Sequence, residues 1–142
     1  MLKGLEHVGL SVSDLDRSIS FYCDLLGLKL ERIIECGEEM GLGEVVGMPG
    51  CTARIAHLQS EKAMLELFEY TSPRGRSMAP DRKQADHGFI HAGFTTEDLH
   101  ADYKRLLEKG VRFFGEPVEF RPNVWVVYFY GPDGEVCELR QV

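Results

Sequence analysis

Two histidines and two glutamates stand at matching positions in two similar parts of the sequence. His7 lies in EHVGLSVSDL and His91 in IHAGFTTEDL, and a constant offset of 84 residues aligns these stretches. Glu66 in AMLELFEY aligns with Glu138 in EVCELRQV at a separate offset of 72 residues. Imidazole and carboxylate groups together suit a divalent metal ion. We therefore interpret His7, Glu66, His91 and Glu138 as candidate metal ligands.

The elements that must position these residues recur in the same order in each half. Each histidine stretch is followed by a helical pattern that starts near a Ser/Thr-x-x-Asp signature and ends at Gly27 or Gly110. Each half closes with its glutamate-bearing strand. Between helix and closing strand, further strands are predicted over residues 28–36 and 52–59 in the first half and over residues 111–114 and 124–130 in the second. Each half therefore reads β-α-β-β-β.

Strand alternation places the four polar residues away from the side packed on the helices. His7 lies on the face opposite Val8 and Leu10, and Glu66 lies opposite its leucine neighbours. One face of a sheet is often simply solvated, which is the alternative for any one of these residues. Their symmetric recurrence favours a concavity in which a metal ion offsets the cost of buried carboxylates.

Other chemically capable residues have no partner in the repeat. His57, His87 and His100 are expected at the surface or in loops. The glycine-rich residues 37–50 lack the spacing of a phosphate-binding loop, so we interpret them as a connector or as a mobile loop over the site. Residues 71–86 contain Pro, Gly and basic residues, which indicates a linker; a patch for an anionic substrate end is the alternative to a solvated hinge.

Composition and charge exclude several classes of partner. The 142 residues favour a single domain, residues 1–142, built from repeats 1–70 and 87–142 with a linker over 71–86. A net charge of −7 argues against nucleic acid or an anionic membrane as partner. No apolar run approaches the roughly 18 residues of a membrane span. The first residues lack the pattern of a secretory leader, so we expect a cytoplasmic protein.

The motifs together resemble the vicinal-oxygen-chelate superfamily, which includes glyoxalase I, methylmalonyl-CoA epimerase, extradiol dioxygenases, and fosfomycin and bleomycin resistance proteins. The resemblance rests on HVGLSVSDLDRSISFYCDLLGLKL, LELFEY, HAGFTTEDL and YGPDGEVCEL and covers essentially the whole chain. It implies an α+β fold of tandem βαβββ modules that form a curved mixed sheet around a metal-binding cup. By position, it implies that His7, Glu66, His91 and Glu138 hold one divalent ion of nickel, cobalt, manganese, zinc or iron.

The resemblance also implies a reaction class. Glu66 makes the ligand set similar to that of bacterial glyoxalase I, and we expect a lyase or isomerase of glyoxalase or epimerase type. It would transfer a proton next to the carbonyl of a small metal-chelated substrate, with Glu66 or Glu138 as base. The alternatives are an Fe(II)-dependent dioxygenase and a non-catalytic binding or resistance protein. Ser11 stands where bacterial glyoxalase I usually carries arginine, so the resemblance does not identify the substrate. Members of this family close the site within one chain or across two, and we expect a homodimer.

Overall fold

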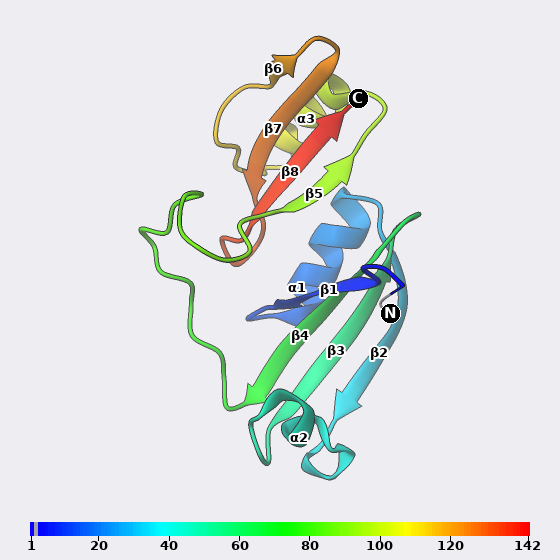
Figure 1. Ribbon diagram of the computed structural model, residues 1–142, viewed down its shortest axis with the longest axis vertical. Coiled ribbons are helices and arrows are strands. Elements are labelled where there is room, and N and C mark those ends of the chain that lie inside the picture. Colours follow the sequence, from blue (N-terminus) through cyan, green and yellow to red (C-terminus); the bar gives the residue numbers. More distant parts are fainter. Residues whose placement is uncertain (2) are drawn as a thin grey trace. The chain divides into compact units, whose positions relative to one another are not determined.

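The computed structural model describes Met1 and residues 3–142 and divides into two compact units, Met1–Ser77 and Met78–Val142. Each unit contains one four-stranded mixed sheet (Figure 1). In both sheets the first strand of the unit pairs in parallel with the last, and the other neighbours are antiparallel. This shared topology confirms the predicted α+β class and the tandem βαβββ modules. The predicted single domain and its linker limits remain a prediction.

The first unit has the strand order β1-β4-β3-β2. Its helix α1 packs against β3 and β4. The interval 37–50, predicted as a connector or mobile loop, instead contains two short helices, because backbone N–H groups find acceptors within the segment, such as Met48 N–H on the Gly43 carbonyl at 2.8 Å. The elements are β1 (His7–Ser11), α1 (Leu15–Ile19), the π-helix η1 (Ser20–Leu25), β2 (Lys29–Cys36), the 3-10 helix η2 (Glu38–Met40), α2 (Leu42–Val46), β3 (Thr52–Gln59) and β4 (Met64–Ser72).

The second unit repeats this order as β5-β8-β7-β6. The predicted strand over 111–114 is wrong, because this segment makes only one isolated bridge, between Phe113 and Phe129. Pro117, which has no backbone N–H, separates it from the edge strand that the sheet uses. The elements are β5 (Ala92–Thr95), α3 (Leu99–Glu108), β6 (Val118–Arg121), β7 (Val124–Tyr130) and β8 (Val136–Gln141).

The helix that follows the first strand starts and stops in the same way in both units. The Asp14 side chain accepts a hydrogen bond from the Arg17 N–H at 2.9 Å, and Asp98 accepts one from the Ala101 N–H at 3.0 Å. These aspartates are N-caps, which satisfy N–H groups that a helix start leaves unpaired. Gly27 (φ 82°) and Gly110 (φ 83°) follow the helices in the left-handed region that favours glycine. The predicted helix signals are thus confirmed.

A second repeated contact ties each closing strand to its helix. The Leu15 N–H donates to Glu69 Oε2 at 3.1 Å, and the Leu99 N–H donates to Gln141 Oε1 at 2.8 Å. Both acceptors stand three residues after the glutamate of the candidate ligand set. The contact therefore links the first turn of each helix to the strand that carries a candidate ligand.

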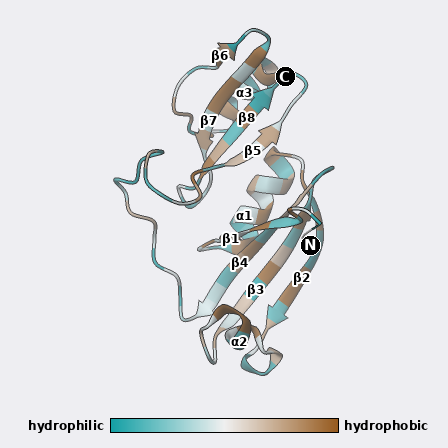
Figure 2. Cartoon of the chain, in the orientation of Figure 1, coloured by the Kyte–Doolittle hydropathy of each residue, from teal (hydrophilic) through white to brown (hydrophobic). Residues whose placement is uncertain are grey.

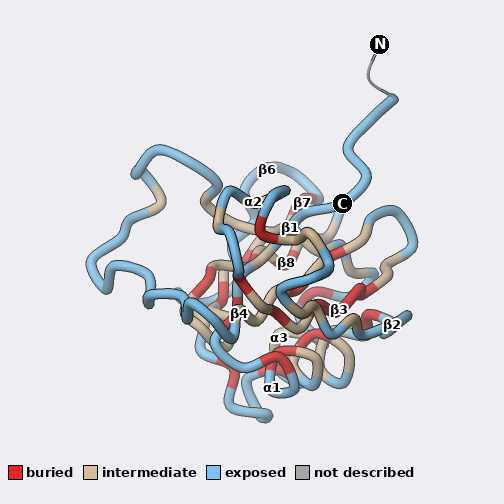
Figure 3. The backbone as a smooth tube through the Cα atoms, turned by 90° about the horizontal axis from the view of Figure 1, so that it is seen from below, coloured by how far each residue is buried: buried red, intermediate tan, exposed pale blue. Residues whose placement is uncertain are grey.

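The core of each unit lies between its sheet and its helix, and buried positions lie on β3, β4, β7 and β8, where parts of β4, β7 and β8 alternate buried with half-buried residues (Figure 3). In Figure 2 β7 is largely hydrophobic, whereas β8 carries hydrophilic positions. The described residues contain no helix of the length and apolarity that crossing a membrane requires. The largest fully buried side chains include Leu15, Tyr22, Leu58 and Leu67 in the first unit and Leu99, Leu106 and Phe129 in the second.

Candidate metal centre

In the first unit, the structure brings His7 and Glu66 together. The parallel register of β1 and β4 places Gly9 opposite Glu66. His7 stands two residues before Gly9 and therefore shares its face of the sheet. The His7 Nε2 lies 3.5 Å from Glu66 Oε2, and the His7 side chain is 43% exposed. This pair is one half of the predicted ligand set.

The other ring nitrogen of His7 is already occupied. Its Nδ1 lies 2.6 Å from Glu6 Oε2. This hydrogen bond raises the pKa of His7 because the carboxylate stabilises the protonated ring, and the nearby Glu66 charge acts in the same direction. A metal-binding histidine commonly donates its second N–H to a carboxylate, which fixes the ring and leaves Nε2 for the ion. Glu6 and His7 have this arrangement.

His57 belongs to the same cluster, and its predicted place at the surface or in a loop is wrong. It lies on β3 directly opposite Glu66 and is only 7% exposed. The Arg32 Nε donates to His57 Nδ1 at 3.0 Å, so the ring proton resides on Nε2. That Nε2 lies 2.8 Å from Glu66 Oε1, so the described residues form a chain of hydrogen bonds from Arg32 through His57 to Glu66.

In the second unit, the structure brings His91 and Glu138 together. The His91 Nε2 lies 3.1 Å from Glu138 Oε2. Gly93 stands opposite Glu138 in the register of β5 and β8, and a Cβ on Gly93 would come within 3.3 Å of Glu138 Oε2. The glycine therefore leaves room for the carboxylate. The His91 Nδ1 lies 3.5 Å from Gln84 Oε1, and the His91 Nε2 faces the Glu138 carboxylate, as the His7 Nε2 faces Glu66 in the first unit.

Tyr128 occupies in the second unit the register position that His57 has in the first. It lies opposite Glu138 on β7, with its ring centre 4.9 Å from that of His91. Burial raises the pKa of Tyr128, and the Glu138 charge adds to the effect, so the hydroxyl stays protonated at neutral pH. The repeat hid this equivalence because His57 precedes Glu66 by nine residues and Tyr128 precedes Glu138 by ten.

The other two histidines lie where the sequence predicts them. His87 is exposed in a loop, and His100 is exposed on α3, where its ring contacts Trp125. Neither lies on a strand beside a candidate ligand. The sequence prediction thus failed for one histidine out of the three that lack a repeat partner.

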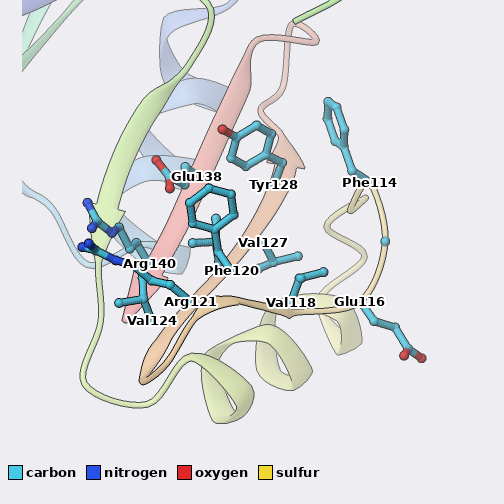
Figure 4. A pocket seen from close by; sticks show the side chains of 12 residues that line it. Phe114, Glu116, Val118, Phe120, Arg121, Val124, Val127, Tyr128, Glu138 and Arg140 are labelled. Carbon is cyan, nitrogen blue, oxygen red and sulfur yellow. The ribbon is translucent and has the colours of Figure 1, made fainter. Parts of the chain in front are cut away.

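A cavity of about 670 Å³ opens on the second sheet beside Glu138 (Figure 4). Its walls are mostly apolar and come from β6, β7 and β8 and from the segment before β6. Its polar side chains are Glu116, Arg121, Tyr128, Glu138 and Arg140. A concave, largely apolar space with a few converging polar groups is typical of a small-molecule site.

The donor set fits a divalent metal ion. Adjacent ligands about 2.1 Å from one ion lie about 3.0 Å apart in an octahedral shell. The N–O separations of 3.5 Å and 3.1 Å within the two pairs are close to that value. The described residues contain no group of three or more His, Cys, Asp or Glu side chains placed to bind an ion by themselves. Each unit thus offers one histidine nitrogen and one carboxylate as donors.

Comparisons with known proteins match nearly the whole chain. The model of the Glyoxalase/Bleomycin resistance protein/Dioxygenase superfamily matches residues 4–139. A probable lactoylglutathione lyase from Synechocystis is 30% identical over 96% of this chain and 94% of its own, and a 2-epi-5-epi-valiolone epimerase from Actinomyces is 32% identical over 95% and 77%. The crystal structure of a glyoxalase family protein from Bacillus cereus is similar with a TM-score of 0.89 at 25% identity, covering 99% of this chain and 94% of that one.

Proposed function

The chain belongs to the glyoxalase/bleomycin resistance protein/dioxygenase superfamily, and we propose that it is a metal-dependent lyase or isomerase that moves a proton next to the carbonyl group of a small substrate. The observation that carries the proposal is the His–Glu pair in each unit, in which His Nε2 faces a carboxylate oxygen. Two relatives named as a lyase and an epimerase support the reaction class.

In this proposal the two pairs bind one divalent metal ion, and the residues around them hold the ligands in place. Glu6 orients His7, and the His57 N–H holds Glu66. A bound ion supplies Lewis-acid polarisation of the substrate carbonyl. The proposed ligands are His7, Glu66, His91 and Glu138.

We assign the role of base to Glu138. Glu66 has histidines at both of its oxygens, and its Oε1 accepts the His57 N–H, which fixes its position. Glu138 contacts one histidine and borders the open cavity, so it can reach a proton on the carbon next to the carbonyl. Tyr128, which keeps its hydroxyl proton, can donate a hydrogen bond to the carbonyl oxygen as negative charge develops there.

Exchange of solvent deuterium into hydroxyacetone tests the base. We expect metal-replete protein to catalyse the exchange and Glu138→Gln to lose it. Glu108→Gln, which removes an exposed carboxylate at the end of α3, is the matched control and should exchange at the wild-type rate. Exchange by Glu138→Gln at the wild-type rate would contradict the assignment. Consumption of O₂ without exchange would instead favour a dioxygenase.

Metal stoichiometry tests whether the two pairs form one centre. The full chain should bind one ion, and both His7→Ala and His91→Ala should lose most of that binding. If the wild type binds two ions and each variant keeps one, the pairs act separately and the single centre is wrong. Less than one equivalent, with no rise in thermal stability when a first-row metal is added, would contradict the metal-dependent activity altogether.

A further inference from the structure

Two arginines border the cavity of the second unit close to the proposed base. We propose that Arg121 and Arg140 bind an oxyanion, either a carboxylate or a phosphate group, on the same small molecule whose carbonyl lies at Glu138. The position of the carbonyl rests on the function proposed above. The oxyanion site rests independently on the position of the two arginines at the cavity. The substrate class is thus a small anionic carbonyl compound.

The sheet places Arg140 beside Glu138 on one face. The two residues are separated by one position on β8, so their side chains leave the same face about 6.5 Å apart. Tyr128 and Val126 on β7 stand opposite Glu138 and Arg140. Arg121 ends β6, and in Figure 4 its side chain and that of Arg140 point to the same edge of the cavity.

The guanidinium groups of Arg121 and Arg140 have no carboxylate within ion-pair distance among the described residues. By contrast, Arg54 contacts three carboxylates and Arg105 contacts Asp102. The chain has 23 acidic and 16 basic residues, so carboxylate partners are abundant. Each guanidinium presents a planar fork of N–H donors that suits a carboxylate or phosphate.

The equivalent position in the first unit shows that the fold does not require an arginine there. Phe68 stands two residues after Glu66 and faces Ser11, as Arg140 stands two residues after Glu138 and faces Thr95. The same sheet position is therefore aromatic in one unit and cationic in the other. This asymmetry favours a role in ligand recognition over a role in folding.

The remaining cavity wall indicates an apolar part in the same ligand. Phe114, Val118 and Phe120 border the cavity and are 48%, 61% and 79% exposed. Large apolar side chains that gather at one exposed site are a feature of binding surfaces. A volume of about 670 Å³ lies within the usual range for small-molecule sites, about 300–1,000 Å³. A compound with one charged end and a short apolar body would use both features.

Calorimetric titration tests the oxyanion site without any turnover. The probes are inorganic phosphate, pyruvate and the neutral hydroxyacetone, each added to the full chain as purified and after treatment with a chelator. We expect at least one of the two anions to bind in both samples, and to bind more tightly than hydroxyacetone in the chelated sample. The ratio of phosphate to pyruvate affinity then identifies the preferred oxyanion.

Charge-matched variants assign the binding to the two arginines. Arg121→Gln and Arg140→Gln should each weaken binding of the preferred anion about tenfold or more, since each loses a charge-assisted hydrogen bond. Lys104→Gln removes the same charge from the exposed side of α3 and should bind as the wild type does. Equal anion affinity in all three variants, or no anion binding by the wild type, would overturn the proposal. Anion binding without deuterium exchange would instead reject the proposed activity and leave the oxyanion site standing.

Discussion

Replacing His57 by phenylalanine should weaken both the fold and the metal site. His57 is buried and joins Arg32 to Glu66 through hydrogen bonds of 3.0 Å and 2.8 Å. Phenylalanine keeps the ring volume but removes both nitrogens. The variant therefore leaves the Arg32 Nε without its acceptor and Glu66 Oε1 without its donor, while the packing changes little.

The size of the effect follows from these two lost partners. A buried polar group without a partner costs about 1–3 kcal/mol. Water can partly replace both lost partners because Arg32 is exposed and the Glu66 side chain is 17% exposed. We therefore expect the free energy of unfolding to fall by about 1 kcal/mol, at the lower end of that range. Loss of a group that orients a metal ligand typically costs about 10- to 100-fold in metal affinity, so Zn²⁺ binding should weaken to that extent.

Urea unfolding and Zn²⁺ titration measure the two effects. His57→Gln, which can donate and accept, should lose less than His57→Phe in both measurements. Tyr128→Phe is the matched change at the equivalent position, and because the Tyr128 hydroxyl makes no hydrogen bond among the described residues, its stability should stay within about 0.5 kcal/mol. Wild-type stability and Zn²⁺ affinity in His57→Phe would refute the proposed chain of hydrogen bonds.

Three further predictions concern the fold. Gln141→Ala should lower the free energy of unfolding by about 0.5–2 kcal/mol, measured by urea unfolding, because the Leu99 N–H loses its acceptor. Leu106→Ala should cost about 2–5 kcal/mol in the same assay because Leu106 is fully buried, whereas its half-exposed neighbour Leu107→Ala should cost far less. Burial acts to raise the pKa of Asp102, but hydrogen bonds from Thr96 and Arg105 outweigh it and hold that pKa below its usual value. The stabilisation is present above the unfolded pKa of about 3.9 and is lost as pH falls through the lower folded value, so thermal unfolding of Asp102→Asn should show a smaller drop toward acid pH than the wild type.

Local signals in the sequence account for most of the fold that could be predicted. The limits of β3 and β7 agree with the predicted residues 52–59 and 124–130; β7 is an apolar and aromatic run, whereas β3 mixes apolar residues with polar ones. The Ser/Thr-x-x-Asp signatures, whose aspartates are the N-caps in the structure, and the terminal glycines located both helices because these signals act within one turn. Edge strand β6 was missed because all of its four residues are exposed and carry no burial pattern.

Contacts set by strand pairing were harder to predict. Whether His57 meets Glu66 depends on the register across the β3–β4 connection, which is one residue shorter than the β7–β8 connection. The offset of 72 residues that aligns Glu66 with Glu138 therefore matches His57 with Phe129 and misses Tyr128. The cluster of Arg32 with His57 likewise joins two neighbouring strands, and no spacing along one strand indicates it.

The differences between the two units favour a different role for each unit in the proposed reaction. The ligand positions are alike, since His7 and Glu66 match His91 and Glu138 in register and contact. Their surroundings differ at two equivalent points, where the first unit has His57 and Phe68 and the second has Tyr128 and Arg140. A histidine that holds its carboxylate by a hydrogen bond favours a fixed ligand. A protonated phenol and a guanidinium beside the other carboxylate favour substrate binding and proton transfer there. If this division is correct, Glu66→Gln lowers metal affinity more than Glu138→Gln does, while Glu138→Gln lowers the exchange rate more at saturating metal.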